Sequence, residues 1–274
     1  MAVTLADITH LRKMCGAGMM DCKKALEDAE NDFDKAMEII RKNGMAVAAK
    51  RSDRDASEGC VLAADNGDFA AIVAVKCETD FVAKNAEFVA MTQSFLDLAM
   101  VNKPTSIDEL LALSFSNGRT VQDSITDRIG VTGEKMELGY YEYVKDVFTT
   151  SYIHHGNKLA TIASFNKSFD HQVSRDIAMQ VAAMNPVSLT QDDVPQKVIN
   201  TELEIARDKA RQAGKPDNLL DRIAQGALQK FFKENTLLQQ DFIKDTQITI
   251  DQYLKKQDKD LVVTSFKRVT LNVD

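Results

Sequence analysis

Thiol and imidazole side chains close to the N-terminus are the first candidates for chemistry. His10, Cys15 and Cys22 could suggest a zinc site. Zinc sites usually pair ligands about two to five residues apart, however, and Cys15 and Cys22 are expected to fall on separate helical stripes. We therefore expect buried structural thiols at these positions and no metal site.

Two adjacent histidines, His154 and His155, are the second candidate. They fall in a predicted turn, and a metal role would require both rings to converge although neighbouring side chains tend to diverge. We expect a surface contact instead. The sequence contains neither GxxxxGK[ST] nor GxGxxG, the glycine-rich patterns that cradle nucleotide phosphates. We accordingly expect no catalytic residues, no cofactor and no GTP bound by the chain itself.

The segment Glu-Thr-Asp-Phe-Val-Ala-Lys-Asn lies where a buried strand is predicted to end and a helix has not yet begun. This position predicts the tip of a loop. In one interpretation, Thr79 or Asp80 caps the helix that follows. Phe81 then packs back onto Phe88 or Phe95 as a hydrophobic staple.

A second interpretation of the same segment gives it a partner. The acidic-aromatic pair Asp80-Phe81, held on a rigid strand end, would enter a cleft of another protein. The ring would fill a pocket there, and the carboxylate would perturb a nearby cation. The residues by themselves leave both interpretations open.

Three short helices are predicted at the N-terminus. Thr4 caps the first, which breaks at Gly16-Ala17-Gly18. The second covers about residues 20–29, and the third begins after Asp32 and ends at Gly44, read as a C-cap glycine. Because some forty residues bury little apolar area, we expect this bundle to be an interaction module on a larger body.

A polar linker at residues 52–58 separates this bundle from a strand pattern. Residues 60–64 and 69–77 read as two strands of a hairpin, because Asn66-Gly67 between them is a strong hairpin signal. The second strand is apolar at almost every position, so both of its faces should be covered. A helix at about residues 85–99 is predicted to provide that cover.

The same order of elements recurs after a helical connector. Residues 149–153 and 159–165 read as a second hairpin, and residues 171–184 as the helix that follows it, which we interpret as an internal duplication. Residues 191–236 carry two amphipathic patterns joined by Gly-Lys-Pro, which predicts an antiparallel helical hairpin. Residues 261–273 alternate as a last strand that returns to the second sheet.

The composition excludes several classes of protein. The 274 residues include 34 Lys and Arg against 41 Asp and Glu, and the net charge of -7 argues against direct nucleic-acid binding. Cys15, Cys22, Cys60 and Cys77 form no CxxC pair, so we expect free thiols in a reducing cytoplasm. No apolar run reaches the roughly 20 residues of a membrane-spanning helix, which predicts a soluble chain without membrane contact.

Several segments together resemble a known family. They are Leu11-Arg12, Gly16–Leu26, Cys77–Ala83, Tyr152–Gly156, Gly214–Pro216 and Phe231–Glu234. In this order they resemble elongation factor Ts, a family of non-enzymatic exchange factors that make the translational GTPase elongation factor Tu release GDP. The resemblance spans nearly the whole chain.

The resemblance implies an α+β fold of three parts. Residues 1–55 would form a ubiquitin-associated-like helical module, and residues 56–140 and 141–274 two related core subdomains with small antiparallel sheets. The helical hairpin at residues 191–236 would be inserted in the second subdomain, and some members of the family use it to form homodimers.

The resemblance also implies contacts with elongation factor Tu. The residues expected to lie beside its magnesium site are Thr79, Asp80, Phe81 and Val82. The residues expected to touch its nucleotide domain are Arg12, Met19 and Met20. The contact expected from the second subdomain is His154.

The sequence departs from the family at a few positions. His155 stands where many members have glycine, Asn157 and Lys158 replace a Gly-Arg pairing, and the helical C-terminal extension of some members is absent. Two other functions stay open. One is a hydrolase or transferase that uses His154 or His155 with a carboxylate, for which no motif is present. The other is a passive protein-binding scaffold without exchange activity.

Overall fold

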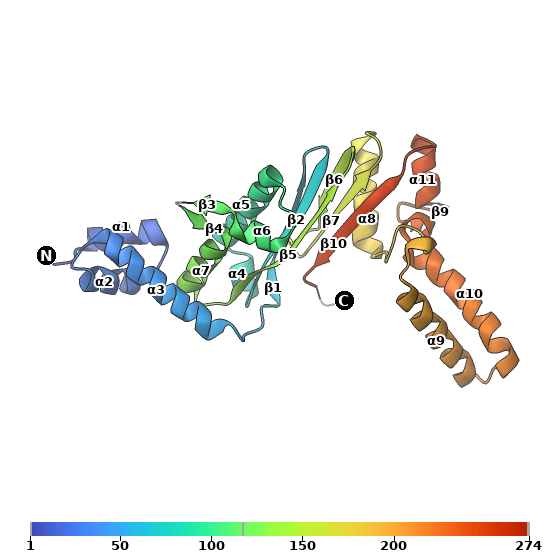
Figure 1. Ribbon diagram of the computed structural model, residues 1–274, viewed down its shortest axis with the longest axis horizontal. Helices are drawn as coiled ribbons and strands as arrows, with labels where there is room; N and C mark the ends of the chain where they lie inside the picture. The colour runs from blue at the N-terminus through green and yellow to red at the C-terminus, as the bar shows by residue number, and fades with distance from the viewer. Residues whose placement is uncertain (1, 117, 273–274) are drawn as a thin grey trace. The chain divides into compact units, whose positions relative to one another are not determined.

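The computed structural model describes residues 2–116 and 118–272 and divides into two compact units. The segments of the first unit are Met1–Leu62, Val73–Tyr141 and Thr270–Asp274. The segments of the second unit are Ala63–Ile72 and Glu142–Val269. Each unit combines helices with short strands, as the α+β prediction requires (Figure 1).

The first unit contains the helices of the N-terminal half of the chain. Its helices are α1 (Leu5–Cys15), α2 (Met19–Asp28), α3 (Phe33–Arg51), α4 (Asp80–Ala83), α5 (Ala86–Asn102), α6 (Ile107–Ala112) and α7 (Val121–Thr132). The strands of the N-terminal half are β1 (Glu58–Asp65), β2 (Phe69–Cys77), β3 (Ser114–Ser116), β4 (Arg119–Thr120) and β5 (Met136–Lys145). A three-stranded sheet has the order β1-β2-β5, and β3 pairs with β4.

The first and third N-terminal helices begin at the predicted caps, Thr4 and Asp32. Thr4 and Asp7 form a reciprocal capping box at the start of α1, and Gly16 ends that helix in the left-handed conformation. The Asp32 side chain accepts the backbone N–H of Lys35 at the start of α3. The apolar stripes of the helices meet in one small core that includes Leu11, Cys22, Leu26 and Ala36.

The predicted end of the third helix is wrong. Helix α3 continues through Gly44 to Arg51, and Gly44 is buried. A Cβ atom added to Gly130 of α7 would lie 2.7 Å from the Cα atom of Gly44, so the two backbones almost touch. Gly44 therefore serves the close approach of α3 and α7, a role that tertiary packing creates and that resembles a helix stop in the sequence.

The first hairpin and its covering helix agree with the prediction. The backbone N–H of Asn66 donates to the Phe69 oxygen at 3.0 Å and closes the turn between β1 and β2. Strand β2 is buried at nearly every position, and Phe88 and Phe95 of α5 are fully buried. Strand β5 was not predicted, because its residues were read as part of a helical connector.

The second unit repeats the order of a hairpin followed by a helix. Its helices are α8 (His171–Met184), α9 (Gln196–Gln212), α10 (Asp217–Asn235) and α11 (Ile250–Gln257), with short 3-10 helices η1 (Gln191–Asp193) and η2 (Leu237–Gln239). Its strands are β6 (Phe148–Ile153), β7 (Leu159–Phe165), β8 (Asp241–Phe242), β9 (Asp245–Thr249) and β10 (Val263–Thr270). Helix α8 has the predicted bounds.

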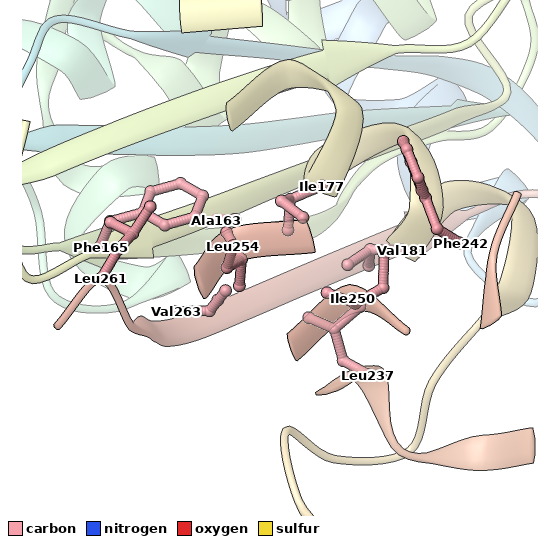
Figure 2. Packing of buried hydrophobic residues seen from close by; sticks show 10 residues of the cluster. All are labelled: Ala163, Phe165, Ile177, Val181, Leu237, Phe242, Ile250, Leu254, Leu261 and Val263. Carbon is pink, nitrogen blue, oxygen red and sulfur yellow. The ribbon is translucent and has the colours of Figure 1, made fainter. Parts of the chain in front are cut away.

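The core of the second unit lies between β7, α8 and the segments that follow the helical hairpin. Figure 2 shows ten of its residues, among them Phe165 of β7, Ile177 of α8 and Leu254 of α11. The sheet has the order β10-β7-β6, which confirms that the last strand returns to it. Val273, the last position of that predicted strand, lies outside the described residues.

Helices α9 and α10 form the predicted antiparallel hairpin (Figure 1). Leu228 and Phe232 of α10 pack with Val194, while Ile205 of α9 and Leu219 of α10 stay exposed. Within residues 2–116 and 118–272, none of the helices combines the length and apolar character needed to cross a membrane.

Candidate functional site

The segment from Thr79 to Val82, here called the Phe81 turn, forms the start of the one-turn helix α4. The hydroxyl of Thr79 accepts the backbone N–H of Val82 at 3.4 Å and caps α4, whereas the side chain of Asn85 caps the longer helix that was predicted at residues 85–99. The predicted staple is wrong, because the Phe81 side chain does not pack on the core and Phe81 is 84% exposed. A large apolar ring thus projects from a capped turn at the end of a buried strand.

A carboxylate from a distant part of the sequence holds this turn. Glu134, which follows α7, accepts the backbone N–H of Thr79 at 3.1 Å and the Thr79 hydroxyl at 2.7 Å. The same hydroxyl therefore donates to Glu134 while it caps α4. The Glu134 side chain thus fixes both the backbone N–H and the hydroxyl of Thr79, where the turn begins.

The residue before the turn is fixed as well. Glu78 accepts the backbone N–H of Lys135 at 2.6 Å and a guanidinium N–H of Arg54 at 2.9 Å. The Lys135 ammonium in turn donates to the Arg54 carbonyl oxygen at 2.8 Å. The segment after α7 and the end of the N-terminal module thus hold the strand end from which Phe81 projects.

The charge next to the exposed ring is already paired. Asp80 accepts a hydrogen bond from Lys84 at 2.7 Å, one helical turn away, and this bond holds the pKa of Asp80 below its usual range. The carboxylate therefore stays ionised at neutral pH. Asp80 and Val82 are half-buried, so Phe81 is the residue of the turn that is most available to a partner.

The other residues expected to face a partner in the first unit are on the N-terminal helices. Arg12 lies on α1 and is exposed. Met19 and Met20 begin α2 and are 43% and 74% exposed, although methionine is a residue type that folded chains usually bury. All three side chains are accessible on the pair of helices α1 and α2.

His154 opens the turn between β6 and β7, here called the His154 turn (residues 154–157), and it is exposed. The Tyr152 hydroxyl lies 2.9 Å from its Nδ1 atom. The guanidinium of Arg175, on α8, lies 5.8 Å from the centre of the Tyr152 ring. The His154 ring is therefore oriented by its own hairpin, and the neighbouring helix supports the tyrosine that orients it.

The N-terminal histidine and thiols do not form the zinc site that was considered. The His10 ring packs edge-on against Phe33, with centroids 5.2 Å apart. Cys15 and Cys22 belong to different helices as predicted, yet their sulfur atoms face each other at 3.7 Å. Among the residues that the structure describes, no group of three or more His, Cys, Asp or Glu side chains could hold a metal ion.

Comparison with known proteins decides the family. A family model described as Elongation factor TS matches residues 78–272. A relative named Elongation factor Ts from Porphyromonas gingivalis is 67% identical over 274 residues, with 100% of both chains covered. Relatives of the same name are 54% identical in Azobacteroides pseudotrichonymphae (100% of each chain) and 48% identical in Christiangramia forsetii (98% of each chain). The chain belongs to the elongation factor Ts family.

Membership in the elongation factor Ts family gives the chain a role in translation elongation. The match to the family model begins at Glu78, the first residue after the strand that carries the Phe81 turn. The relatives named above also cover the N-terminal helices, which lie before that match.

Sequence reasoning missed the residues that hold the Phe81 turn of this elongation factor Ts family member. Glu134 is 55 positions from Thr79, and Lys135 is 57 positions from Glu78. No periodicity or cap pattern links residues that far apart. The one local signal was Gly133, a left-handed helix stop that leaves Glu134 just beyond the end of α7.

Proposed function

We propose that the chain is a guanine nucleotide exchange factor for elongation factor Tu. It binds the GDP-bound partner, disturbs the magnesium and phosphate site, and promotes release of GDP so that GTP can enter. The observation that carries this proposal is the Phe81 turn, in which an 84% exposed ring is held on a braced strand end. No covalent chemistry takes place, so the chain is not an enzyme in the usual sense.

Exchange follows from differential binding. A factor that binds nucleotide-free elongation factor Tu more tightly than the GDP-bound form must, by linkage, lower the affinity of that partner for GDP by the same ratio. Burial of one phenylalanine ring stabilises a complex by roughly 1.5 to 3 kcal/mol, which corresponds to about a ten- to hundredfold effect. Phe81 contributes this binding energy only when the pocket of elongation factor Tu that receives the ring is open.

The neighbouring residues of the turn have separate roles in this mechanism. Thr79 fixes the position of the turn through its bonds to Glu134 and Val82. Asp80 brings a negative charge close to the partner's magnesium ion. Val82 extends the apolar contact beside the ring.

Other contacts widen the interface. Arg12, Met19 and Met20 are proposed to contact the nucleotide domain of elongation factor Tu, since two exposed methionines and an exposed arginine suit a mixed apolar and polar surface. His154 is proposed to make the contact of the second subdomain. The hairpin of α9 and α10 is proposed to mediate homodimer formation through its exposed apolar side chains.

We also propose the module boundaries and the cellular setting. The family and the net charge of -7 support a three-part division at residues 55 and 140, a cytoplasmic location and the absence of nucleic-acid contact. Limited proteolysis tests the boundaries, because the linker at residues 52–58 is expected to be cut first.

The decisive experiment follows GDP release. Purified elongation factor Tu is loaded with fluorescent GDP and chased with excess unlabelled GDP, with and without catalytic amounts of this chain. Faster release in proportion to the chain added supports exchange activity. Unchanged release, with the chain folded and shown to bind the partner, would leave the passive scaffold as the function.

A further inference from the structure

The thiols of Cys15 and Cys22 face each other across the turn between α1 and α2. Their sulfur atoms are 3.7 Å apart, and residue Ala17 lies between them in the chain. The Ala17 N–H points to the Cys15 sulfur at 3.5 Å, and the Cys22 thiol donates to the Ala17 carbonyl oxygen at 3.7 Å. The two sulfurs are thus held on the same side of one short turn.

The two thiols differ in accessibility. Cys15 is half-buried, and it lines a cavity of ≈ 320 Å³ together with Met14, Met37 and Arg41. Cys22 is fully buried in the small core of the N-terminal helices. A small reagent dissolved in water therefore meets Cys15 first, and Cys22 becomes available only through Cys15.

We propose that Cys15 and Cys22 are a redox-active dithiol that exchanges with small-molecule disulfides such as oxidised glutathione to form an intramolecular disulfide. Such pairs are the usual form of disulfide in reducing compartments, where a bond forms transiently and reports the redox state.

The exchange proceeds in two balanced steps. The Cys15 thiolate attacks one sulfur of oxidised glutathione, the glutathione S–S bond breaks, and one glutathione thiolate leaves and takes up a proton. Cys22 then attacks the Cys15 sulfur of the mixed disulfide, gives up its proton, and displaces the second glutathione as a thiol. Two protein thiols are oxidised, and one glutathione disulfide is reduced to two thiols.

The direction of attack follows from the local environment. Burial, followed by the proximity of Cys15, raises the pKa of the Cys22 thiol to about 12. Cys22 thus remains protonated at neutral pH and is a poor first nucleophile. It serves as the resolving thiol, because its attack on the mixed disulfide is intramolecular and the charge of Cys15 that helps to raise its pKa is then gone.

Two glycines give the turn backbone freedom that formation of the bond can use. A disulfide requires a sulfur–sulfur separation of about 2.05 Å, so the sulfurs must approach by roughly 1.6 Å. The turn includes Gly16, in the left-handed conformation with φ +72°, and Gly18, which begins α2. The bond would then tie α1 to α2 directly, within a bundle whose core is small.

The test uses the full chain in buffers of reduced and oxidised glutathione, quenched with acid and alkylated. Peptide mass spectrometry should find Cys15 and Cys22 joined, with a loss of two hydrogens and no bound glutathione. The Cys22→Ser variant should accumulate glutathione on Cys15, because no resolving thiol remains. The Cys15→Ser variant should leave Cys22 unmodified.

Three outcomes would overturn the proposal. In one, native Cys15 keeps glutathione while Cys22 stays reduced. In the second, both thiols stay reduced at every ratio of the two glutathione forms. In the third, Cys22 reacts in the Cys15→Ser variant as fast as in the native chain. Because the readout is mass alone, the result does not depend on exchange activity.

Discussion

The Phe81 turn and the His154 turn both lie at strand ends and both present an exposed ring, yet they are supported differently. The Phe81 turn is fixed by Glu134, 55 residues away in the sequence. The His154 turn is fixed within its own hairpin, where the backbone N–H of His154 donates to the Leu159 oxygen at 2.8 Å and Tyr152 orients the ring.

The two kinds of support determine which substitutions can disturb each turn. A turn that is supported by distant residues loses its geometry when any part of that support moves, even if the turn itself is unchanged. A turn that is supported by its own hairpin depends on its neighbours in sequence.

Removal of the exposed ring should separate function from stability. Phe81→Ala should slow stimulated GDP release by about ten- to hundredfold, because roughly 1.5 to 3 kcal/mol of contact is lost in the complex. The free energy of unfolding should change by less than about 0.5 kcal/mol, since the ring is 84% exposed. Stopped-flow fluorescence and urea unfolding measure the two quantities.

Val101→Ala is the matched control for that experiment, because Val101 is an apolar residue of α5 that is 80% exposed. It should leave both quantities unchanged. Equal slowing by the two variants would remove any specific role for Phe81.

A change in the packing of α3 on α7 should displace the Phe81 turn and leave the His154 turn in place. In Gly130→Ala the new Cβ atom would lie 2.7 Å from the Cα atom of Gly44, so the helices must separate, at a cost of about 1 to 3 kcal/mol. Glu134 follows α7 and should shift with it, which slows GDP release. Substitutions at the His154 turn should show the same effects in this background as in the native chain.

Gly44→Ala provides the contrast. Its Cβ atom would lie 3.5 Å from the nearest atom, an ordinary contact, and alanine favours a helix interior over glycine by about 0.5 to 1 kcal/mol. The variant should therefore be as stable as the native chain or more stable in urea unfolding. Destabilisation by both variants to the same extent would contradict the close approach described here.

Acid should weaken the hydrogen-bond network that holds α8, the helix that carries Arg175. Asp176 follows Arg175 on α8 and is buried, and burial opposes ionisation of its carboxyl group. Hydrogen bonds from Lys244, Gln172 and Tyr253 outweigh burial and hold the pKa of Asp176 below its usual range. The stability that it contributes is present above its unfolded pKa of about 3.9 and is lost as the pH falls through the lower folded value.

The Asp176→Asn variant tests this sign. It should lower the free energy of unfolding by about 1 to 2 kcal/mol at pH 7, because a charged acceptor of three hydrogen bonds is replaced. The difference from the native chain should shrink as the pH is lowered from 7 to 3 in urea titrations. A difference that is constant across this range would show that ionisation of Asp176 is not its source.

The carboxylate of Glu134 should matter through both of its hydrogen bonds. Glu134→Ala removes the acceptor for the Thr79 N–H and hydroxyl, and should slow GDP release about fivefold through a loss of roughly 1 kcal/mol in positioning. Glu134→Gln keeps one acceptor oxygen and should fall between the native chain and the alanine variant. A glutamine variant as slow as the alanine variant would contradict this graded role.

The smallest effect is expected at the His154 turn. Tyr152→Phe removes the hydroxyl that lies 2.9 Å from His154 Nδ1, which should weaken binding of elongation factor Tu about two- to threefold, or roughly 0.5 kcal/mol. Tyr140→Phe, at a tyrosine of β5 that is 43% exposed, is the control. A loss of interaction free energy larger than the roughly 1 kcal/mol expected for Glu134→Ala would reverse the comparison between the two turns.

The sequence predicted those elements whose signals are local. The caps at Thr4 and Asp32, the Asn66-Gly67 turn and the bounds of α8 all follow from residues within a few positions of one another. For the same reason it placed the Phe81 turn at a strand end and named Thr79 or Asp80 as a cap.

The errors share the opposite cause. Gly44 was read as a helix stop because its partner, Gly130, is remote in sequence. Strand β5 was read as part of a helical connector, although its three tyrosines and Val144 favour a strand, because the strand it pairs with, β2, lies far earlier in the sequence. The exposure of Phe81 and the support from Glu134 depend on packing that no short window of sequence contains.

The double anchoring of Thr79 has a kinetic consequence for complex formation. Because Glu134 orders the turn before a partner arrives, its conformational entropy is already lost in the free chain and is not subtracted from the binding energy. Association should then lack a slow loop-ordering step. The observed association rate should rise linearly with partner concentration without a plateau, and differences among Phe81 variants should appear in dissociation.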